Sequence, residues 1–178
     1  LGPGNGNSMV QSLDGGFVIT GWQGPYVLLT KADSAGNLVW TKYFGSTIGM
    51  NPNNKGFDII LLQDGGFLLS GFYNPSSGIN DAYFIRTDQN GDTLWTKIYP
   101  SPYSITDEYY FFKVRQNSFG EFIAAGQIEY DSSQPFDISL LKLDSSGNQI
   151  WHKEIDLGKK ETFRNIAITD SSYSIIGE

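Results

Sequence analysis

An internal repeat constrains the fold of this chain more than any other feature. The block Asp-x-x-Gly-x-x-x-Trp-x-Lys occurs at residues 33–42, 88–97 and 144–153, and its tryptophans are spaced by 55 and 56 residues. A second block occurs at 16–21, 66–71, 121–126 and 172–177. It has an aromatic residue at its second position and ends with glycine. Periods of this size are typical of solenoids, propellers and arrays, in which one unit cannot bury its own apolar face and stability comes from stacked neighbours.

The composition excludes several classes of protein. The 178 residues hold about three and a half units, and 39% apolar, 15% aromatic and 17% charged residues fit a packed core. No run of eighteen apolar residues occurs, so we expect no membrane span. The net charge of -7, with twelve scattered Lys and Arg, argues against a nucleic-acid partner. The absence of cysteine excludes disulfides, thiolate catalysis and Cys-ligated zinc.

The second repeat predicts four short strands and no helix. Its apolar runs of strand length are separated by tight turns that contain Asp and Gly at 64–66 and 88–91. Four antiparallel strands at a period near fifty are typical of a propeller blade. The expected strands are Phe57–Gln63, Phe67–Gly71, Ala82–Thr87 and Thr93–Ile98.

We therefore predict an all-β fold, a single repeat domain over 1–178 built as a β-propeller of four-stranded antiparallel blades. About three and a half blades are expected, at about 7–50, 51–108, 109–161 and an incomplete 162–178. Because a propeller needs about four blades to close, we expect a partial propeller, either a fragment of a longer chain or one that closes with another copy or another protein.

The first strand of each unit is predicted to keep one register. Phe57, Phe112 and Phe163 each stand ten residues before the aromatic residue of the second block, and Asn7 occupies this place in the first unit. The first strand of the chain is therefore expected to be atypical, as terminal repeats are.

The residues that recur once per unit are interpreted as structural. An Asp followed by a Gly three residues later is typical of a turn, because the carboxylate caps backbone N–H groups and glycine adopts positive φ. A calcium site at Asp33 and Asn37 is the alternative, and it would need further oxygen ligands. The tryptophans are expected to pack between blades. The predicted structural residues are Asp33, Asp88, Asp144, Gly36, Gly91, Gly147, Trp40, Trp95 and Trp151.

No catalytic, metal or cofactor site is predicted. His152 is the single histidine. It stands at the repeat position held by Thr41 and Thr96 in the first two units, which favours the interpretation of His152 as a strand residue at the surface. Without a second histidine, a cysteine or a nucleophile elbow, neither a triad nor a histidine-rich metal site is expected. A pair of carboxylates that acts as in glycosidases stays open, since such residues lie far apart in sequence.

The connections that vary in length are the expected binding surface. The turns between strands one and two and between strands three and four are short and constant, whereas the connections at the other end vary freely. They carry the aromatic residues Trp22, Tyr73, Tyr103 and Tyr130, which suit contact with a glycan or a protein, the alternative being that some of them cover the edge of the core.

The repeats at 14–21 and 31–42 resemble those of large exported bacterial propeller proteins, many of which carry a type IX secretion signal. The resemblance covers almost the whole chain and implies a fold more than a function; no type IX signal lies within these residues. The spacing from Asp to Gly and Trp is also similar to the tryptophan-docking motif of quinoprotein propellers, but Gly follows Asp by three positions instead of four. It differs too from the sialidase Asp-box, in which Gly follows Asp by two.

The leading hypothesis is a non-catalytic binding or scaffold module, extracellular or on the bacterial cell surface, that engages a protein or glycan through the variable loops. The alternative is part of a propeller enzyme, a glycosidase or a quinoprotein, with catalytic groups outside this segment. A third reading is purely structural, with other copies or chains that complete the propeller.

Overall fold

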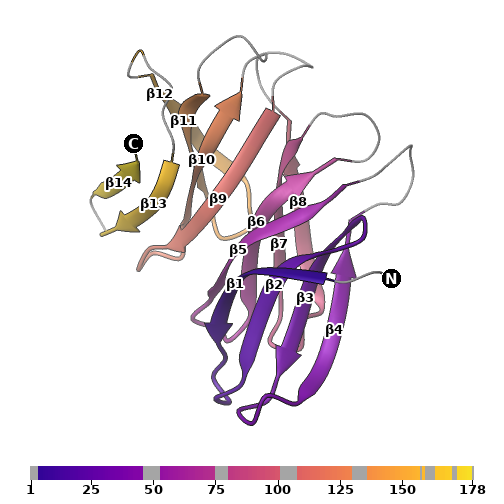
Figure 1. Ribbon diagram of the computed structural model, residues 1–178. Helices are drawn as coiled ribbons and strands as arrows, with labels where there is room; N and C mark the ends of the chain where they lie inside the picture. Colours follow the sequence, from indigo (N-terminus) through magenta and orange to yellow (C-terminus); the bar gives the residue numbers. More distant parts are fainter. Residues whose placement is uncertain are drawn as a thin grey trace.

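A computed structural model describes the positions of eight stretches of the chain (Figure 1). They are residues 4–45, 53–74, 80–100, 108–129, 136–156, 158, 163–169 and 172–177. These residues form fourteen antiparallel strands in four separate sheets of four, four, four and two strands, and no helix occurs among them. The prediction of an all-β repeat fold is confirmed. No described helix is long and apolar enough to cross a membrane.

Each four-stranded sheet is a meander in which consecutive strands are neighbours. The first sheet comprises β1 (Gly4–Gln11), β2 (Phe17–Gln23), β3 (Tyr26–Ala32) and β4 (Leu38–Phe44). The second comprises β5 (Lys55–Leu61), β6 (Phe67–Tyr73), β7 (Asp81–Thr87) and β8 (Thr93–Tyr99). The third comprises β9 (Glu108–Gln116), β10 (Phe122–Glu129), β11 (Phe136–Leu143) and β12 (Gln149–Ile155). The fourth pairs β13 (Phe163–Ile168) with β14 (Tyr173–Gly177).

The sheets pack face to face, and one apolar cluster fills each of the three junctions. Alternate residues of a strand point to opposite faces, so Phe67 and Leu69 of β6 pack against the first sheet while Leu68 packs against the third. The second sheet is therefore buried on both faces, which explains why β6 is an almost continuous apolar run. The opening strands β1, β5, β9 and β13 contact one another in this order, and each is an edge of its sheet (Figure 1).

Each opening strand carries one extra residue opposite its partner strand, a β-bulge. The bulge residues are Asn7, Phe57, Phe112 and Arg164.

The prediction of one register for all four units is wrong in the fourth. Leu61 pairs with Phe67, six residues on, but Ile168 pairs with Tyr173, only five residues on. The β13–β14 hairpin is one residue shorter, which places Phe163 opposite Gly177, where Phe111 lies opposite Gly126 in the third sheet. Phe163 is therefore a core residue, and Arg164 takes the bulge position.

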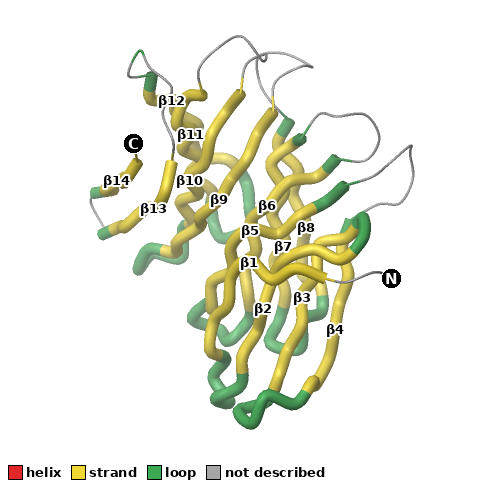
Figure 2. Tube along the Cα trace, in the orientation of Figure 1, coloured by secondary structure: helices red, strands yellow, loops and turns green. Residues whose placement is uncertain are grey.

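In each four-stranded sheet, the turn between strands one and two and the turn between strands three and four lie at the same end (Figure 2). The last residues of the second strands, Gln23 and Tyr73, lie at the opposite end. Antiparallel pairing requires this separation, because strands one to two and three to four turn at the same end.

Candidate functional site

The repeated Asp residues lie at the heads of the turns between the third and fourth strands. The Oδ1 atom of Asp33 accepts hydrogen bonds from the backbone N–H groups of Ala35 (2.9 Å) and Asn37 (2.8 Å). The side-chain amide of Asn37 donates to Oδ2 at 2.9 Å. These donors hold the pKa of Asp33 below its ordinary value, with the Asn37 side chain as the largest cause. The carboxylate therefore faces N–H donors, whereas calcium would need converging oxygen atoms.

Asp88 and Asp144 make the same turn. Their Oδ1 atoms accept from the backbone N–H groups of Asp92 (2.9 Å) and Asn148 (2.7 Å), which are the largest causes of the lowered pKa of each carboxyl.

The repeated tryptophans contact the next sheet through its turn glycine. The ring of Trp40 lies so close to Gly91 that a Cβ added there would come within 2.8 Å of it. Trp95 lies against Gly147 in the same way, at 2.9 Å. Trp151 instead packs on Tyr173 of β14, with ring centroids 6.0 Å apart.

The repeated lysines contact the residue after that glycine. Lys42 Nζ lies 2.7 Å from Asp92 Oδ1, and Lys97 Nζ lies 3.2 Å from Asn148 Oδ1. The second repeat block thus holds both halves of a junction. Its Gly91-Asp92 pair is contacted by Trp40 and Lys42 of the first sheet, and its own Trp95 and Lys97 contact the third sheet.

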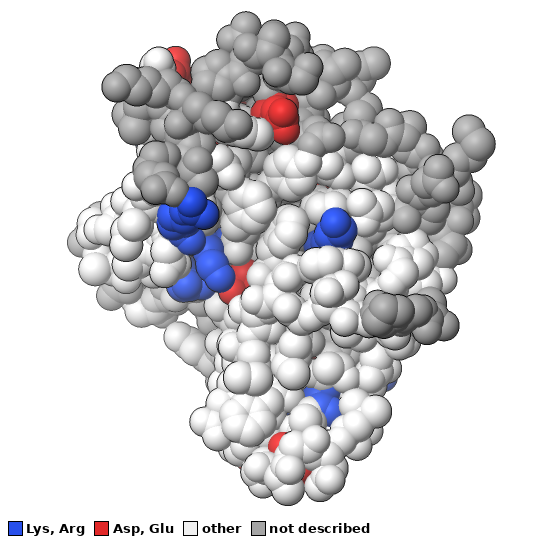
Figure 3. Space-filling model, viewed as in Figure 1, with Lys and Arg blue, Asp and Glu red and all other residues white. Residues whose placement is uncertain are grey.

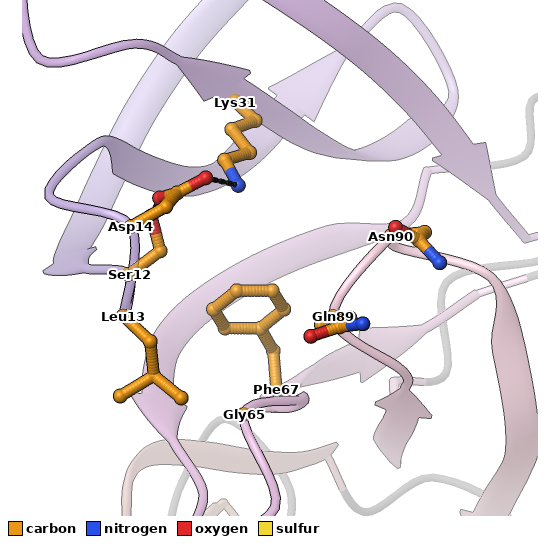
Figure 4. A pocket seen from close by; sticks show the side chains of 8 residues that line it. All are labelled: Ser12, Leu13, Asp14, Lys31, Gly65, Phe67, Gln89 and Asn90. Carbon is orange, nitrogen blue, oxygen red and sulfur yellow. Dashed lines mark hydrogen bonds and ion pairs between the residues drawn. The ribbon is translucent and has the colours of Figure 1, made fainter.

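A hollow of about 170 Å³ lies at the turn end between the first two sheets (Figure 4). Lys31 forms an ion pair with Asp14 at 2.5 Å on one wall, and Phe67 and Gln89 lie on the other. The lining residues are Ser12, Leu13, Asp14, Lys31, Gly65, Phe67, Gln89 and Asn90.

A matching hollow lies between the second and third sheets, where Arg86 pairs with Asp64 and Phe122 takes the place of Phe67. In the third sheet Lys142 pairs with Glu121 at 2.6 Å. A cavity that recurs at successive junctions is a property of the repeat, so it does not single out a ligand site.

His152 lies among groups that are reminiscent of a triad but lack its geometry. Its Nε2 atom is 2.8 Å from Ser139 Oγ and 3.6 Å from Glu154 Oε1. A triad needs the acid on the other ring nitrogen and a nucleophile that substrate can reach. Here both partners meet the same nitrogen, and Ser139 is fully buried. Burial lowers the pKa of His152, against the smaller opposing effect of Glu154.

Two of the four predicted ligand-binding aromatics are described by the structure. Trp22 of β2 is half-buried, and the ammonium of Lys55 lies 4.9 Å from the centre of its ring. Tyr73 of β6 packs on Tyr83, with centroids 5.5 Å apart, and joins the apolar cluster between the first two sheets. Tyr103 and Tyr130 lie outside the described residues.

The structure brings together a polar cluster on the opening strands that the sequence reasoning missed. Asp58 of β5 is buried, and its carboxylate contacts Lys113 Nζ (3.3 Å) and Arg115 Nη1 (2.9 Å) of β9. Ser8 of β1 donates to it at 2.7 Å, and Arg115 Nη2 donates to Asn165 of β13 at 3.2 Å. The signal in the sequence is a lone carboxylate inside an apolar strand, which burial permits only when the charge is paired.

An aromatic cluster adjoins these charges on the same strands. The rings of Phe57 and Phe112 lie 5.0 Å apart, and Tyr110 stacks on Phe112 with centroids 5.8 Å apart. Phe72 contacts both Phe57 and Tyr110.

Within the described residues, no group of three or more His, Cys, Asp and Glu side chains could hold a metal ion. The sequence matches no protein-family model and shows no significant match to a curated protein.

Proposed function

We propose that the four sheets are consecutive blades of a β-propeller and that the chain is a non-catalytic binding or scaffold module. The contact of β1, β5, β9 and β13 in sequence order supports this architecture, because the opening strands of blades surround a common axis. A crystal structure of the intact protein tests it. Opening strands arranged around a closed ring would support the proposal, and an open, solenoid-like stack of the sheets would contradict it.

The binding surface that we propose lies at the strand ends opposite the turns and carries Trp22, Tyr73, Tyr103 and Tyr130. The observation that carries this proposal is the contrast between the two ends of each sheet. At the turn end, capped Asp residues repeat one geometry, so this end is alike in the three four-stranded sheets. At the opposite end Trp22 is half-buried, large and amphipathic, as is typical of residues that contact glycans and proteins.

The partner is a glycan or a protein outside the cell, at the bacterial surface. The resemblance of the repeats to exported propeller proteins supports this location. We do not expect the module to perform catalysis.

Glycan arrays and capture of purified envelope proteins test the binding surface. Replacing the four aromatics by alanine should weaken binding at least tenfold, because each removes a large contact area. Phe119, whose exposed fraction is 73%, lies at the turn end, so Phe119→Ala is the matched control. Equal affinity of the fourfold variant and the unsubstituted protein would remove the site assignment.

A further inference from the structure

The opening strands carry an excess of positive charge in an acidic protein. Asp58 is the single carboxylate within contact of Lys113 and Arg115 among the described residues. The chain has a net charge of -7, so this local excess runs against its overall charge. Figure 3 shows basic side chains gathered beside an acidic one over β9 and β13 on the face where the opening strands lie.

The carboxylate of Asp58 has no capacity left for further donors. Its two oxygens accept from Ser8 Oγ, Lys113 Nζ, Arg115 Nη1 and, at 3.2 Å, the backbone N–H of Val114. Four donors fill the lone-pair sites of a carboxylate. Asp58 therefore orients the two cations and cannot neutralise both of them.

The two cations keep donors for a further anion. An ammonium has three N–H donors and a guanidinium has five. In the described structure Lys113 uses one donor, on Asp58, and Arg115 donates to Asp58, Asn165 and the carbonyl of Val114. The side chains are 29% and 32% exposed, so solvent and solutes reach them.

The groups around the cations suit a sugar. Phe57 and Phe112 are half-buried at the bulges next to Asp58 and Lys113, and an aromatic ring packs against the aliphatic face of a pyranose. The amide of Asn165 lies beside Arg115, where it can bond to a hydroxyl group.

We propose that Lys113, Arg115 and Asn165, with the rings of Phe57 and Phe112, bind a carboxylate-bearing sugar, a uronate. The planar guanidinium of Arg115 matches a carboxylate, and Lys113 adds a second positive charge. A single anionic group fits this site better than a densely charged polymer, because the negative charge of the rest of the protein repels the remainder of such a polymer. The site lies on the opening strands and goes beyond the binding surface proposed at the strand ends.

Isothermal titration with a galacturonate trisaccharide tests the site, with its methyl ester as the neutral counterpart. We expect the acid to bind and the ester to bind at least tenfold more weakly, since a charged hydrogen bond contributes roughly a tenfold to hundredfold change in affinity. Arg115→Gln should weaken binding of the acid by about the same factor. Lys153→Gln is the matched control, because Lys153 is exposed on β12, the opposite edge of the same sheet, and should change nothing.

Two further variants keep the test decisive if Arg115→Gln does not fold, as circular dichroism will show. Asp58→Asn keeps an oxygen that accepts hydrogen bonds from the two cations but removes the competing negative charge, so it should tighten uronate binding. Arg115→Lys keeps the charge but loses the planar geometry and should weaken binding.

Equal binding of acid and ester, no binding at millimolar trisaccharide, equal loss in Lys153→Gln, or no tightening in a folded Asp58→Asn would overturn the proposal. A preference for a sulfated trisaccharide would overturn the uronate assignment. Replacing Trp22, which belongs to the binding surface at the strand ends, should not change uronate binding. The two proposals can therefore fail independently of each other.

Discussion

Trp40 and Trp95 show how one residue of the repeat connects successive sheets. Each ring lies on the turn glycine of the next sheet, Gly91 or Gly147, where a side chain would collide with it. The glycine is therefore required twice, for its positive φ and for the space above it. Gly36 has the same φ class, but no described atom lies within 4 Å of the place where its Cβ would be.

Replacing Gly91 should therefore cost more than replacing Gly36. Both substitutions force alanine into a left-handed conformation, at about 1–2 kcal/mol. Gly91→Ala also displaces Trp40, and this overpacking adds about 1–3 kcal/mol. Urea unfolding of both variants measures the difference. Equal losses of free energy would mean that the Trp40 contact does not constrain Gly91.

His152 predicts a loss of stability in weak acid. Burial lowers its pKa in the folded state below the ordinary 6.5, so the unfolded chain takes up the proton first. The stability that the neutral side chain of His152 contributes is complete above about pH 6.5. It is lost as the pH falls toward the lower pKa of the folded state. His152→Thr, which places there the residue of the first two repeats, should flatten stability between pH 7.5 and 5.5. Chemical denaturation at both pH values measures the slope, and an unchanged slope would contradict this role.

At the scale of the element, the bulge in each of the first three opening strands explains the glycine that closes the second repeated block. A Cβ added to Gly71 would overlap the carbonyl oxygen of Lys55, and one added to Gly21 or Gly126 would overlap that of Asn5 or Tyr110. The neighbouring strand therefore approaches the glycine more closely than any side chain allows.

Gly71→Ala should disrupt the β5–β6 pairing and cost about 3 kcal/mol, the upper end of the usual cost of overpacking, because backbone must move in a sheet that is buried on both faces. Gly15→Ala is the control, since its added Cβ meets no described atom within 4 Å and only the positive φ is strained. Thermal melts compare the two variants. A loss for Gly71→Ala no larger than for Gly15→Ala would show that the strands separate at little cost.

At the scale of the molecule, burial differs between the sheets. The second and third sheets are covered on both faces by neighbours, whereas the first packs on one described face only. Met9 of β1 is 57% exposed, while Ile59, at the equivalent place in β5, is buried. Leu29 on the opposite face of the first sheet is fully buried against the second sheet.

Backbone hydrogen exchange should follow this order. Amides of β6, β7, β10 and β11 should exchange most slowly, because they open only when the buried junctions open. Amides of β1 and β14, edge strands with exposed side chains, should exchange fastest among the strands. Exchange measured by NMR or mass spectrometry tests the order, and uniform protection across all four sheets would contradict it.

The all-β class and the four strands of the second unit could be predicted because turn residues and strand residues alternate along the chain. The strand bounds differ by a few residues, as β5 begins at Lys55 instead of Phe57. The register of the fourth unit could not be predicted. Phe163 and Phe57 stand at the same spacing in the sequence, but the turn between β13 and β14 is one residue shorter than the turn between β5 and β6. The cluster at Asp58 also could not be predicted, because Lys113 is 55 residues away and only the packing of the sheets joins them.

The repeated sequence by itself determined the local structure of one unit of this protein. It specifies where the strands turn, where Asp caps a turn, and which positions recur. These are local properties, set by φ preferences and hydrogen bonds within a few residues. The tertiary structure decided what each recurring residue contacts, since Trp40 meets Gly91 and Lys42 meets Asp92 only after two sheets stack. It also decided which polar residues of the opening strands become neighbours, because that depends on the packing of edges from separate sheets.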